Sequence, residues 1–397
     1  MLSANIYNWL EMDSIVFRFF LSLFFRSVGQ KCSFGTKAFP GLELINFMEY
    51  LFRIQEKIVP ELIAVAENRY TILRNIYYYQ PIGRRALADK TRISERVVRR
   101  ELDFLQSRGL LNISRAGVLI SKSGSDFLAE LDKYIREIKG IKILEERVKD
   151  CLGLEGVVVV PGNLEHSTIK QEIGRFTARL LKKLLRDGDI LVVTGGSTLA
   201  EIANAMCGSE LPLKVKVVPG RGGLGEEVEI QANTIAATIA KKIGGCYQLL
   251  HIPDSLKEAS LDSIMAEPSI QRILTSLQQA NILLHGIGSA EEMARRRDMS
   301  EEQVSALLDK GAVGEALGYY FNAQGEVVYT TTSIGLHLED LQKIEQVIVV
   351  AGDSAKAQAI ISVVSPKYHD LLITDELTAY QILNLKGVIL EKGYRDS

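Results

Sequence analysis

Two hydrophobic patterns divide the chain near residue 152. Before this point apolar residues recur every three or four positions, which predicts amphipathic helices. After it, short apolar runs bounded by glycine, such as DILVVTGG over 189–196, alternate with amphipathic stretches. Buried strands that alternate with helices indicate a parallel sheet covered on both faces. The pattern therefore predicts an α/β, doubly wound, Rossmann-like domain over residues 152–397.

The first 47 residues differ from the rest of the chain. They contain an apolar run from Ser14 to Phe25 that is interrupted by Arg18. A membrane-spanning helix needs about 20 apolar residues, so this run is too short, and the segment lacks the pattern of a secretory signal. We expect residues 1–47 to lie outside the folded protein, translated from an upstream start codon with Met48 as the initiator. A membrane-touching anchor is the alternative.

Residues 49–80 have helical periodicity, broken at Pro60, and the stretch 83–111 predicts two further helices. A tight turn near residues 91–93 separates the two, and Ser94 is expected to cap the second. The stretch from Gly83 to Arg108 contains eight basic and four acidic residues, a net charge of +4. Such a helix pair favours duplex DNA as a ligand, although a solvated basic pair without ligand is the alternative. The expected DNA contacts are Arg84, Arg85, Ser94, Arg96, Arg99 and Arg100.

Two short β-prone runs follow, on either side of the tripeptide 115–117, and predict a hairpin. Together with the helix pair they indicate a winged helix-turn-helix domain over residues 48–124. Residues 125–151 are expected to form one long charged linker helix, along which dimer contacts could lie.

Composition says little about the fold, but it excludes several kinds of chemistry. The 397 residues allow about two or three domains, and the net charge of −2 confines any DNA-binding surface to a local patch. The four cysteines form no C-x-x-C pair, and the five histidines do not match H-E-x-x-H. We therefore expect no metal site, no cofactor and a reducing, cytoplasmic location.

The strand at 189–194 ends at Gly195 and Gly196, and Ser197 and Thr198 open the next helix. Glycines allow close approach of a ligand to the backbone, and free N–H groups at a helix N-terminus attract negative charge. The stretch is neither a Walker A loop nor G-x-G-x-x-G, and an ordinary capped turn is the alternative. The strand-to-helix turn at residues 194–198 therefore predicts a phosphate-binding site.

Three more loops leave the expected carboxyl ends of strands, where α/β sheets bind ligands. One, at 217–237, carries Arg221 followed by Gln231 and Asn233; another carries the arginine triplet 295–297; the last carries Lys356. Helix N-termini combined with these cations fit a ligand that has two phosphates and several hydroxyls. Glu315 could accept a hydrogen bond from a sugar hydroxyl.

The combination of a winged helix with the strings VTGGST, VPGRGGLGEE, QANTIAA, HGIG, GYYFNAQGEVV and LLITDELTA resembles the SorC family of bacterial sugar-binding transcriptional regulators. The similarity covers residues 48–395, and residues 1–47 fall outside it. The resemblance implies a repressor of the operon for lower glycolysis, which includes glyceraldehyde-3-phosphate dehydrogenase. Its implied inducer is fructose 1,6-bisphosphate, which would reduce cooperative binding to the operator.

The resemblance also implies roles for individual residues. Ser197 departs from a threonine in the family relative but keeps its hydroxyl, and Gly220 departs from an alanine, which leaves the loop freer. The implied effector-binding residues are Gly195, Gly196, Ser197, Thr198, Arg221, Gln231, Asn233, Arg296, Glu315 and Lys356.

Two alternatives remain open. One is a regulator of the same family with a different sugar phosphate as effector. The other is a sugar-phosphate isomerase or deaminase, for which Asp375 and Glu315 are the candidate general bases. For the repressor, the expected partners are double-stranded operator DNA, a phosphorylated sugar and further copies of the chain in a dimer or tetramer, with no membrane partner.

Overall fold

The computed structural model describes residues 58–162, 166–206, 212–223, 227–254 and 258–388. Two compact units divide the chain, Met1–Pro60 and Glu61–Ser397, and nearly all described residues belong to the second unit. The predicted extra segment 1–47 lies outside the described residues. Within the described part, no helix combines the length and the apolar character needed to span a membrane.

The first part of the second unit contains the predicted helices and hairpin. Its elements are α3 (Pro60–Tyr79), α4 (Arg84–Thr91), α5 (Glu95–Ser107), β1 (Leu111–Ser114) and β2 (Gly117–Ile120), and β1 pairs with β2 in antiparallel register. Arg92 makes the turn between α4 and α5 with a φ of 56°. Ser94 occupies the N-cap position of α5, but its side chain makes no capping hydrogen bond, which corrects that detail of the prediction. Leu87, Val98 and Leu102 form the centre of a shared core.

The predicted linker helix over 125–151 is wrong, because the chain forms two helices there. They are α6 (Lys122–Ile138) and α7 (Ile141–Leu152), separated by Gly140 with a φ of 58°. This left-handed conformation suits glycine and ends a helix. The apolar stripe of α7, which includes Leu144 and Val148, is buried in the core of the following domain and contacts β3.

A seven-stranded parallel sheet forms the centre of that domain, as predicted. Its strand order is β3-β13-β12-β7-β4-β5-β6. The strands are β3 (Gly156–Val160), β4 (Ile190–Val193), β5 (Lys216–Pro219), β6 (Cys246–Tyr247), β7 (Ile282–Gly286), β12 (Gln346–Val350) and β13 (Leu371–Asp375). The strands inside the sheet are short and mostly apolar, so the sheet must be covered on both sides.

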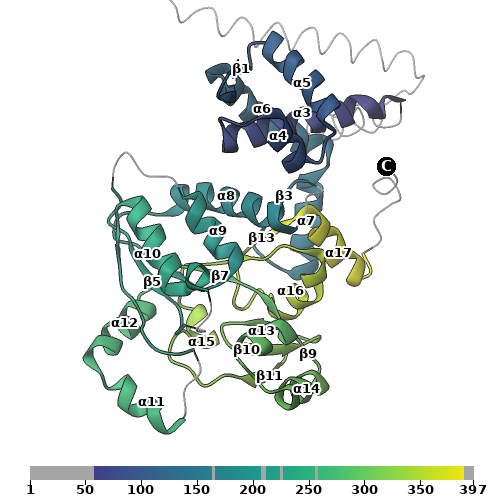
Figure 1. The fold of residues 1–397 in the computed structure, drawn as a ribbon. Coiled ribbons are helices and arrows are strands. Elements are labelled where there is room, and N and C mark those ends of the chain that lie inside the picture. Colours follow the sequence, from purple (N-terminus) through teal and green to yellow (C-terminus); the bar gives the residue numbers. More distant parts are fainter. Residues whose placement is uncertain (1–57, 163–165, 207–211, 224–226, 255–257, 389–397) are drawn as a thin grey trace, which may run out of the picture. The chain divides into compact units, whose positions relative to one another are not determined.

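Helices cover the two faces of the sheet (Figure 1), and the sheet separates two hydrophobic cores. Along β4, Leu191 and Val193 belong to one core and Val192 to the other, as the alternation of side chains in a strand requires. One face carries α8 (His166–Leu184), α9 (Ser197–Ala205) and α10 (Ala232–Ile243). The other carries α7, α12 (Pro268–Gln278), α16 (Ala357–Val363) and α17 (Glu376–Leu385). Shorter elements are η1 (Val228–Ile230), η2 (Ser354–Lys356), α11 (Glu258–Met265) and α15 (Leu338–Leu341).

A second, antiparallel sheet was not predicted from the sequence. Its strand order is β11-β10-β9-β8, and Figure 1 shows its green strands beside α13 and α14. Tyr320 is fully buried at its centre, against Met293 and Ala294 of α13. The elements are β8 (Gly288–Ser289), α13 (Ala290–Arg296), α14 (Glu301–Asp309), β9 (Ala312–Ala316), β10 (Tyr319–Asn322) and β11 (Val327–Thr330). This small sheet places Glu315 and residues 317–335 next to the end of the parallel sheet.

Two histidines are buried together in the parallel sheet. His285 lies in β7 and His369 just before β13, and their ring centroids are 5.1 Å apart. Burial lowers the pKa of His285 to about 4, and burial with the neighbouring His285 lowers the pKa of His369 to about 3. Because both folded-state pKa values lie below the usual 6.5, both rings are held neutral.

Acid should therefore destabilise the domain as the pH falls below 6.5. The stabilisation that each neutral histidine contributes is complete above pH 6.5 and is lost as the pH falls towards the folded pKa. We expect about 2 kcal/mol loss of unfolding free energy per histidine between pH 7 and pH 5. Denaturant titrations at several pH values measure this loss. His285→Asn should flatten the pH dependence, exposed His251→Asn should not, and equal slopes in both variants would refute the assignment.

Candidate functional site

The ends of β4 and β7 define a crevice in the parallel sheet. From β4 the chain continues outward to β5 and β6, whereas β7 lies on the other side of β4 and continues to β12. Thr194 N donates to Leu284 O at 3.2 Å, which joins the two strand ends. Ligands of open α/β sheets bind at such a reversal of strand order, outside the carboxyl ends.

The turn into α9 is shaped by two glycines. Gly196 is the N-cap residue and has a φ of 130°, a conformation that L side chains rarely adopt. At Gly195, a Cβ atom would lie 2.9 Å from Ile230 O, so only glycine allows the loop at 230–232 to approach this closely. That loop leads into α10, whose N-cap residue is Gln231. The N-termini of α9 and α10 thus lie at the same crevice, both with positive dipole ends.

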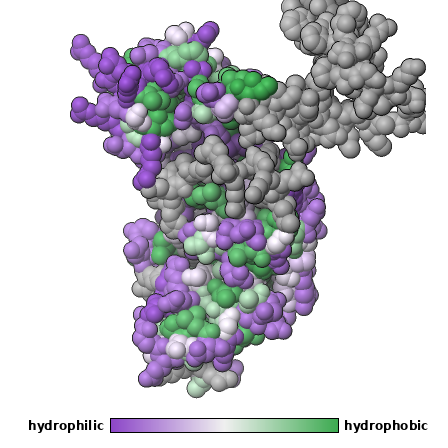
Figure 2. Space-filling model, turned by 90° about the vertical axis from the view of Figure 1, so that its right-hand side faces the viewer, coloured by the Kyte–Doolittle hydropathy of each residue, from purple (hydrophilic) through white to green (hydrophobic). Residues whose placement is uncertain are grey.

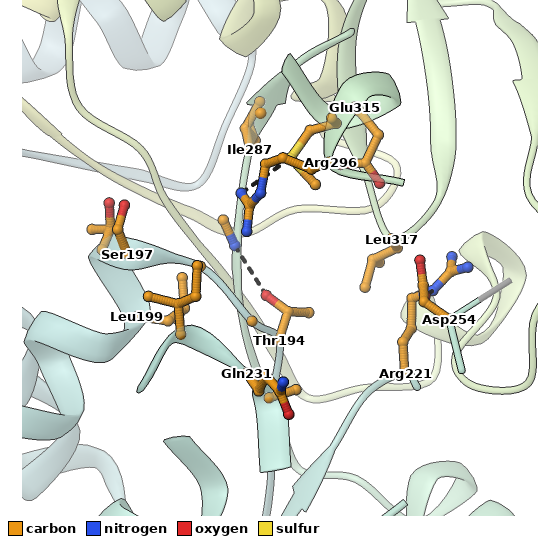
Figure 3. A pocket seen from close by; sticks show the side chains of 18 of the residues that line it. Thr194, Ser197, Leu199, Arg221, Gln231, Asp254, Ile287, Arg296, Glu315 and Leu317 are labelled. Carbon is orange, nitrogen blue, oxygen red and sulfur yellow. Dashed lines mark hydrogen bonds and ion pairs between the residues drawn. The ribbon is translucent and has the colours of Figure 1, made fainter. Parts of the chain in front are cut away.

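A cleft of about 920 Å³, including open solvent at its mouth, occupies this crevice. It brings together nine of the ten predicted effector-binding residues, and Figure 3 shows Ser197 and Arg221 on opposite sides of it. These nine are Gly195, Gly196, Ser197, Thr198, Arg221, Gln231, Arg296, Glu315 and Lys356. Residues of α9, α13, β9 and η2, together with residues of the loops that follow β4 and β5 and precede α10, therefore converge on one cavity.

Asn233 is the predicted residue that the structure does not bring into the cleft. Its amide donates to Leu250 O at 3.0 Å and accepts from Leu250 N at 2.9 Å. Both ends of the amide therefore bind the backbone next to β6, and the side chain anchors that segment. The sequence placed Asn233 near the start of a helix, but only the structure shows which way it faces.

The arginine triplet divides into three different environments. Arg295 is half exposed and forms surface ion pairs with Glu291 and Glu301. Arg296 lines the cleft, where its Nη1 lies 3.4 Å from Met293 Sδ (Figure 3). Arg297 also borders the cleft but is buried, with side-chain exposure of 5%. Because Arg295 is on the surface and Arg297 is buried in ion pairs, Arg296 is the arginine of the triplet best placed to face a ligand.

A buried network of ion pairs lines the cleft on the side of Arg221 (Figure 3). Asp254 Oδ1 accepts from Arg221 Nε and its Oδ2 accepts from Arg297 Nε, each at 2.9 Å. Arg297 also donates to Glu315 Oε1 at 2.9 Å and to Tyr320 Oη at 3.1 Å. Burial alone would lower the pKa of Arg297, but Glu315 and Asp254 raise it further than burial lowers it, which keeps the guanidinium charged.

Arg221 has additional contacts that the sequence did not predict. Its Nη2 donates to Thr331 Oγ1 at 2.8 Å and to the hydroxyl of Ser333. The residue therefore holds the chain that follows β11 while it borders the cleft. Asp254 was not predicted to border the cleft, although a carboxylate shortly after β6 is a signal that the sequence contained, and Arg297 belonged to the predicted triplet but was not the arginine chosen from it.

The two candidate general bases of the enzyme alternative, Asp375 and Glu315, are already hydrogen-bonded within the protein. Asp375 accepts hydrogen bonds from Thr378 N at 3.0 Å and Asp353 N at 2.9 Å, and it caps α17 as an N-cap residue. Glu315 is engaged by Arg297 and by Gly318 N at 2.6 Å. Among the described residues, no cluster of three or more histidine, cysteine or acidic side chains is arranged to hold a metal ion. Both candidate bases thus have structural partners.

The predicted DNA-contact residues lie on α4, α5 and the turn between them, and all are exposed. In the view of Figure 2 the upper part of the molecule, which carries α3 to α6 in Figure 1, is largely hydrophilic. Arg96 and Arg99 are exposed on α5, whereas Val98 and Leu102 of the same helix are buried. Arg100 differs because its Nη2 pairs with buried Glu101 at 2.8 Å.

Comparison with known proteins divides the chain in the same way, into an N-terminal helical domain and an α/β domain. The family model described as "CggR N-terminal DNA binding domain" matches residues 65–135, and the model described as "Putative sugar-binding domain" matches residues 136–384. The central glycolytic genes regulator of Bacillus subtilis is 39% identical over 337 residues, 85% of this chain and 99% of the relative. That of Priestia megaterium is 41% identical over 338 residues, with the same coverage. The chain is thus a transcriptional regulator with a DNA-binding and a sugar-binding domain.

Solved structures place this regulator in a family. A SorC family transcriptional regulator from Enterococcus faecalis is 38% identical with a TM-score of 0.56, over 60% of this chain and 99% of that chain. The full-length sorbitol operon regulator of Klebsiella pneumoniae is 20% identical with a TM-score of 0.59, over 82% and 99%, and shares the fold. The chain belongs to the SorC family of sugar-binding transcriptional regulators.

Proposed function

We propose that this chain represses an operon of glycolytic genes and that fructose 1,6-bisphosphate binds the cleft and induces release of the operator. The central glycolytic genes regulators, to which the chain is similar over nearly their whole length, give the pathway. The form of the cleft gives the ligand class. No cofactor and no catalytic step enter the proposal, and the regulator acts in the cytoplasm, where bacterial DNA lies.

The observation that carries the proposal is that groups able to bind anions line opposite sides of the cleft. Ser197, at the N-terminus of α9, lies on one side of the cleft and Arg221 on the other (Figure 3), and Thr198 and Lys356 also line the cleft. A helix N-terminus binds phosphate through its free N–H groups, and a guanidinium binds phosphate through its planar donors. Gln231 and Glu315 line the same cleft, and their side chains suit sugar hydroxyls. A sugar phosphorylated at both ends matches this set of groups.

For the DNA-binding domain we propose a winged helix that places α5 in the major groove. The order of α4, turn, α5 and the β1–β2 hairpin supports this assignment. Operators of paired half-sites are bound by symmetric oligomers, so we propose a dimer or tetramer as the active form. Binding of the bisphosphate to one arrangement of the effector domains would then shift the population away from the arrangement that holds DNA.

The C-terminal end of α6 offers a connection for this shift. Lys139 Nζ lies 2.8 Å from Glu376 Oε2 of α17 and 3.3 Å from Glu67 Oε1 of α3. Burial alone would lower the pKa of Lys139, but the two carboxylates raise it, so the ammonium stays charged. One side chain thus joins a helix of the effector domain to a helix of the DNA-binding domain.

A thermal-shift titration tests the ligand. A ligand that binds only the folded state raises the melting temperature by mass action. We expect fructose 1,6-bisphosphate to stabilise the full chain more than fructose 6-phosphate, glucose 6-phosphate or dihydroxyacetone phosphate. Lys356→Gln should reduce the effect of the bisphosphate, and the matched surface variant Lys343→Gln should not.

The outcomes separate the candidate functions. A larger shift with a monophosphate would retain the family and the cleft but replace the effector and the pathway. Operator binding, measured by fluorescence anisotropy with a duplex selected from random DNA, should weaken when the bisphosphate is added. Unchanged operator affinity, cooperativity and assembly state in the saturated protein would contradict the proposed induction. Turnover of any of these sugar phosphates would revive the enzyme alternative.

A further inference from the structure

A lysine outside the predicted set lies at the opening turn of α9. Lys170 belongs to the second turn of α8, and its Nζ donates to Ser197 Oγ at 2.9 Å. Ser197 is the first residue of α9 and lines the cleft. Its hydroxyl accepts from Lys170 and keeps its own proton, which it can donate to an anion at the helix N-terminus.

Other charges surround this lysine. Lys356 and Arg296 both line the cleft and lie near enough to Lys170 to act on its charge, and Lys356 Nζ lies 3.6 Å from Glu292 Oε2. Burial and the positive charges of Lys356 and Arg296 lower the pKa of Lys170, against the opposing effect of Glu292 and Asp353. Like charges disfavour one another, and the free N–H groups of α9 add to the positive potential. An anion bound at this point would relieve the repulsion.

We propose that Lys170 is a third cationic ligand of the phosphate held at the N-terminus of α9, acting with Arg296 and Lys356 to favour a doubly charged phosphate ester. The inference rests on the proposed function, because it names a further residue of the same cleft. The flexible ammonium lies within hydrogen-bond distance of a hydroxyl that itself faces the phosphate position. A bound phosphate oxygen would therefore receive donors from the backbone, from Ser197 and from the lysine.

A structural role for Lys170 is the competing explanation. Helices α8 and α9 pack closely, since a Cβ atom at Gly174 would lie 2.8 Å from the carbonyl carbon of Glu201. A hydrogen bond that only ties these helices together would contribute to the melting temperature of the ligand-free protein. It would leave the affinity for phosphate and the salt dependence of that affinity unchanged.

Isothermal titration calorimetry on the full chain distinguishes the two roles. Fructose 1,6-bisphosphate and, separately, inorganic phosphate are titrated into the wild type, Lys170→Gln, Lys170→Arg and Lys182→Gln at two salt concentrations. Lys182 is an exposed lysine of the same helix and serves as the matched control. We expect Lys170→Gln to weaken both ligands by about tenfold, as expected for loss of one charge-assisted hydrogen bond.

The remaining results decide the proposal. Lys170→Gln should also reduce the salt dependence of binding, whereas Lys170→Arg should restore most of the affinity and Lys182→Gln should match the wild type. Bisphosphate affinity within twofold of wild type in Lys170→Gln would overturn this inference and leave the proposed function standing. Lys170-dependent binding of inorganic phosphate without binding of any sugar phosphate would support the inference and overturn the proposed function. A wild type that binds neither would overturn both.

Discussion

Asp254→Ala is expected to lower the free energy of unfolding by about 3 to 5 kcal/mol, because it leaves buried charge without compensation. One carboxylate serves the Nε atoms of both Arg221 and Arg297, and Asp254 itself is only 3% exposed. Arg297 would keep Glu315, but Arg221 would keep only hydroxyl acceptors. Denaturant unfolding followed by far-ultraviolet circular dichroism measures the loss.

A surface ion pair provides the control for this prediction. Glu291 pairs with half-exposed Arg295 at 3.2 Å within α13. Exposed pairs are worth roughly 0.2 to 1 kcal/mol, so Glu291→Ala should have a small effect. Asp254→Asn retains one acceptor and should fall between the two. A loss below about 1 kcal/mol in Asp254→Ala would show that the network is not needed for stability.

The double variant Arg96→Ala/Arg99→Ala is expected to bind the operator about a hundredfold more weakly than the wild type, since each good contact to a base is worth about 1–3 kcal/mol. Both side chains are exposed on the first two turns of α5. Fluorescence anisotropy with the selected duplex measures the affinity. The slope of log affinity against log salt should also become shallower, by about one for each arginine–phosphate ion pair that the substitutions remove.

Arg272→Ala serves as the matched control, because Arg272 is an exposed arginine on α12 of the effector domain. It should leave the affinity for operator DNA unchanged. Equal affinities of the double variant and the wild type would show that another surface contacts DNA. The melting temperature of each variant, measured in parallel, reports whether the DNA-binding domain remains folded.

The sequence predicted the parts of the fold that depend on local pattern. Apolar runs that end in glycine placed the parallel strands, and the carboxyl ends of those strands placed most of the cleft residues. Gly196 illustrates why, since glycine at a strand-to-helix turn permits the positive φ found in the structure. The helix pair and the hairpin were predicted for the same reason.

Features that depend on distant contacts were not predictable in this way. Asn233 occupies the expected helix start but binds the backbone of Leu250, a contact across 17 residues of sequence. Asp254 binds Arg221 across 33 residues and Arg297 across 43. The break at Gly140 was hidden by charged residues on both sides, and the small antiparallel sheet by strands of two to five residues. Features of this kind can be located only when the position in space of the contacting residue is known.

The position of α8 has a consequence for how far a signal must travel. Three successive residues of this helix have contacts in different directions: Lys170 binds Ser197 at the cleft, while Gln171 accepts from Tyr79 Oη and Glu172 pairs with Arg74 Nε at 3.5 Å. Tyr79 and Arg74 belong to α3. One turn of helix, about 5.4 Å long, therefore touches both the effector cleft and the DNA-binding domain. This turn would therefore give the proposed population shift a short second connection between the two domains, in addition to Lys139.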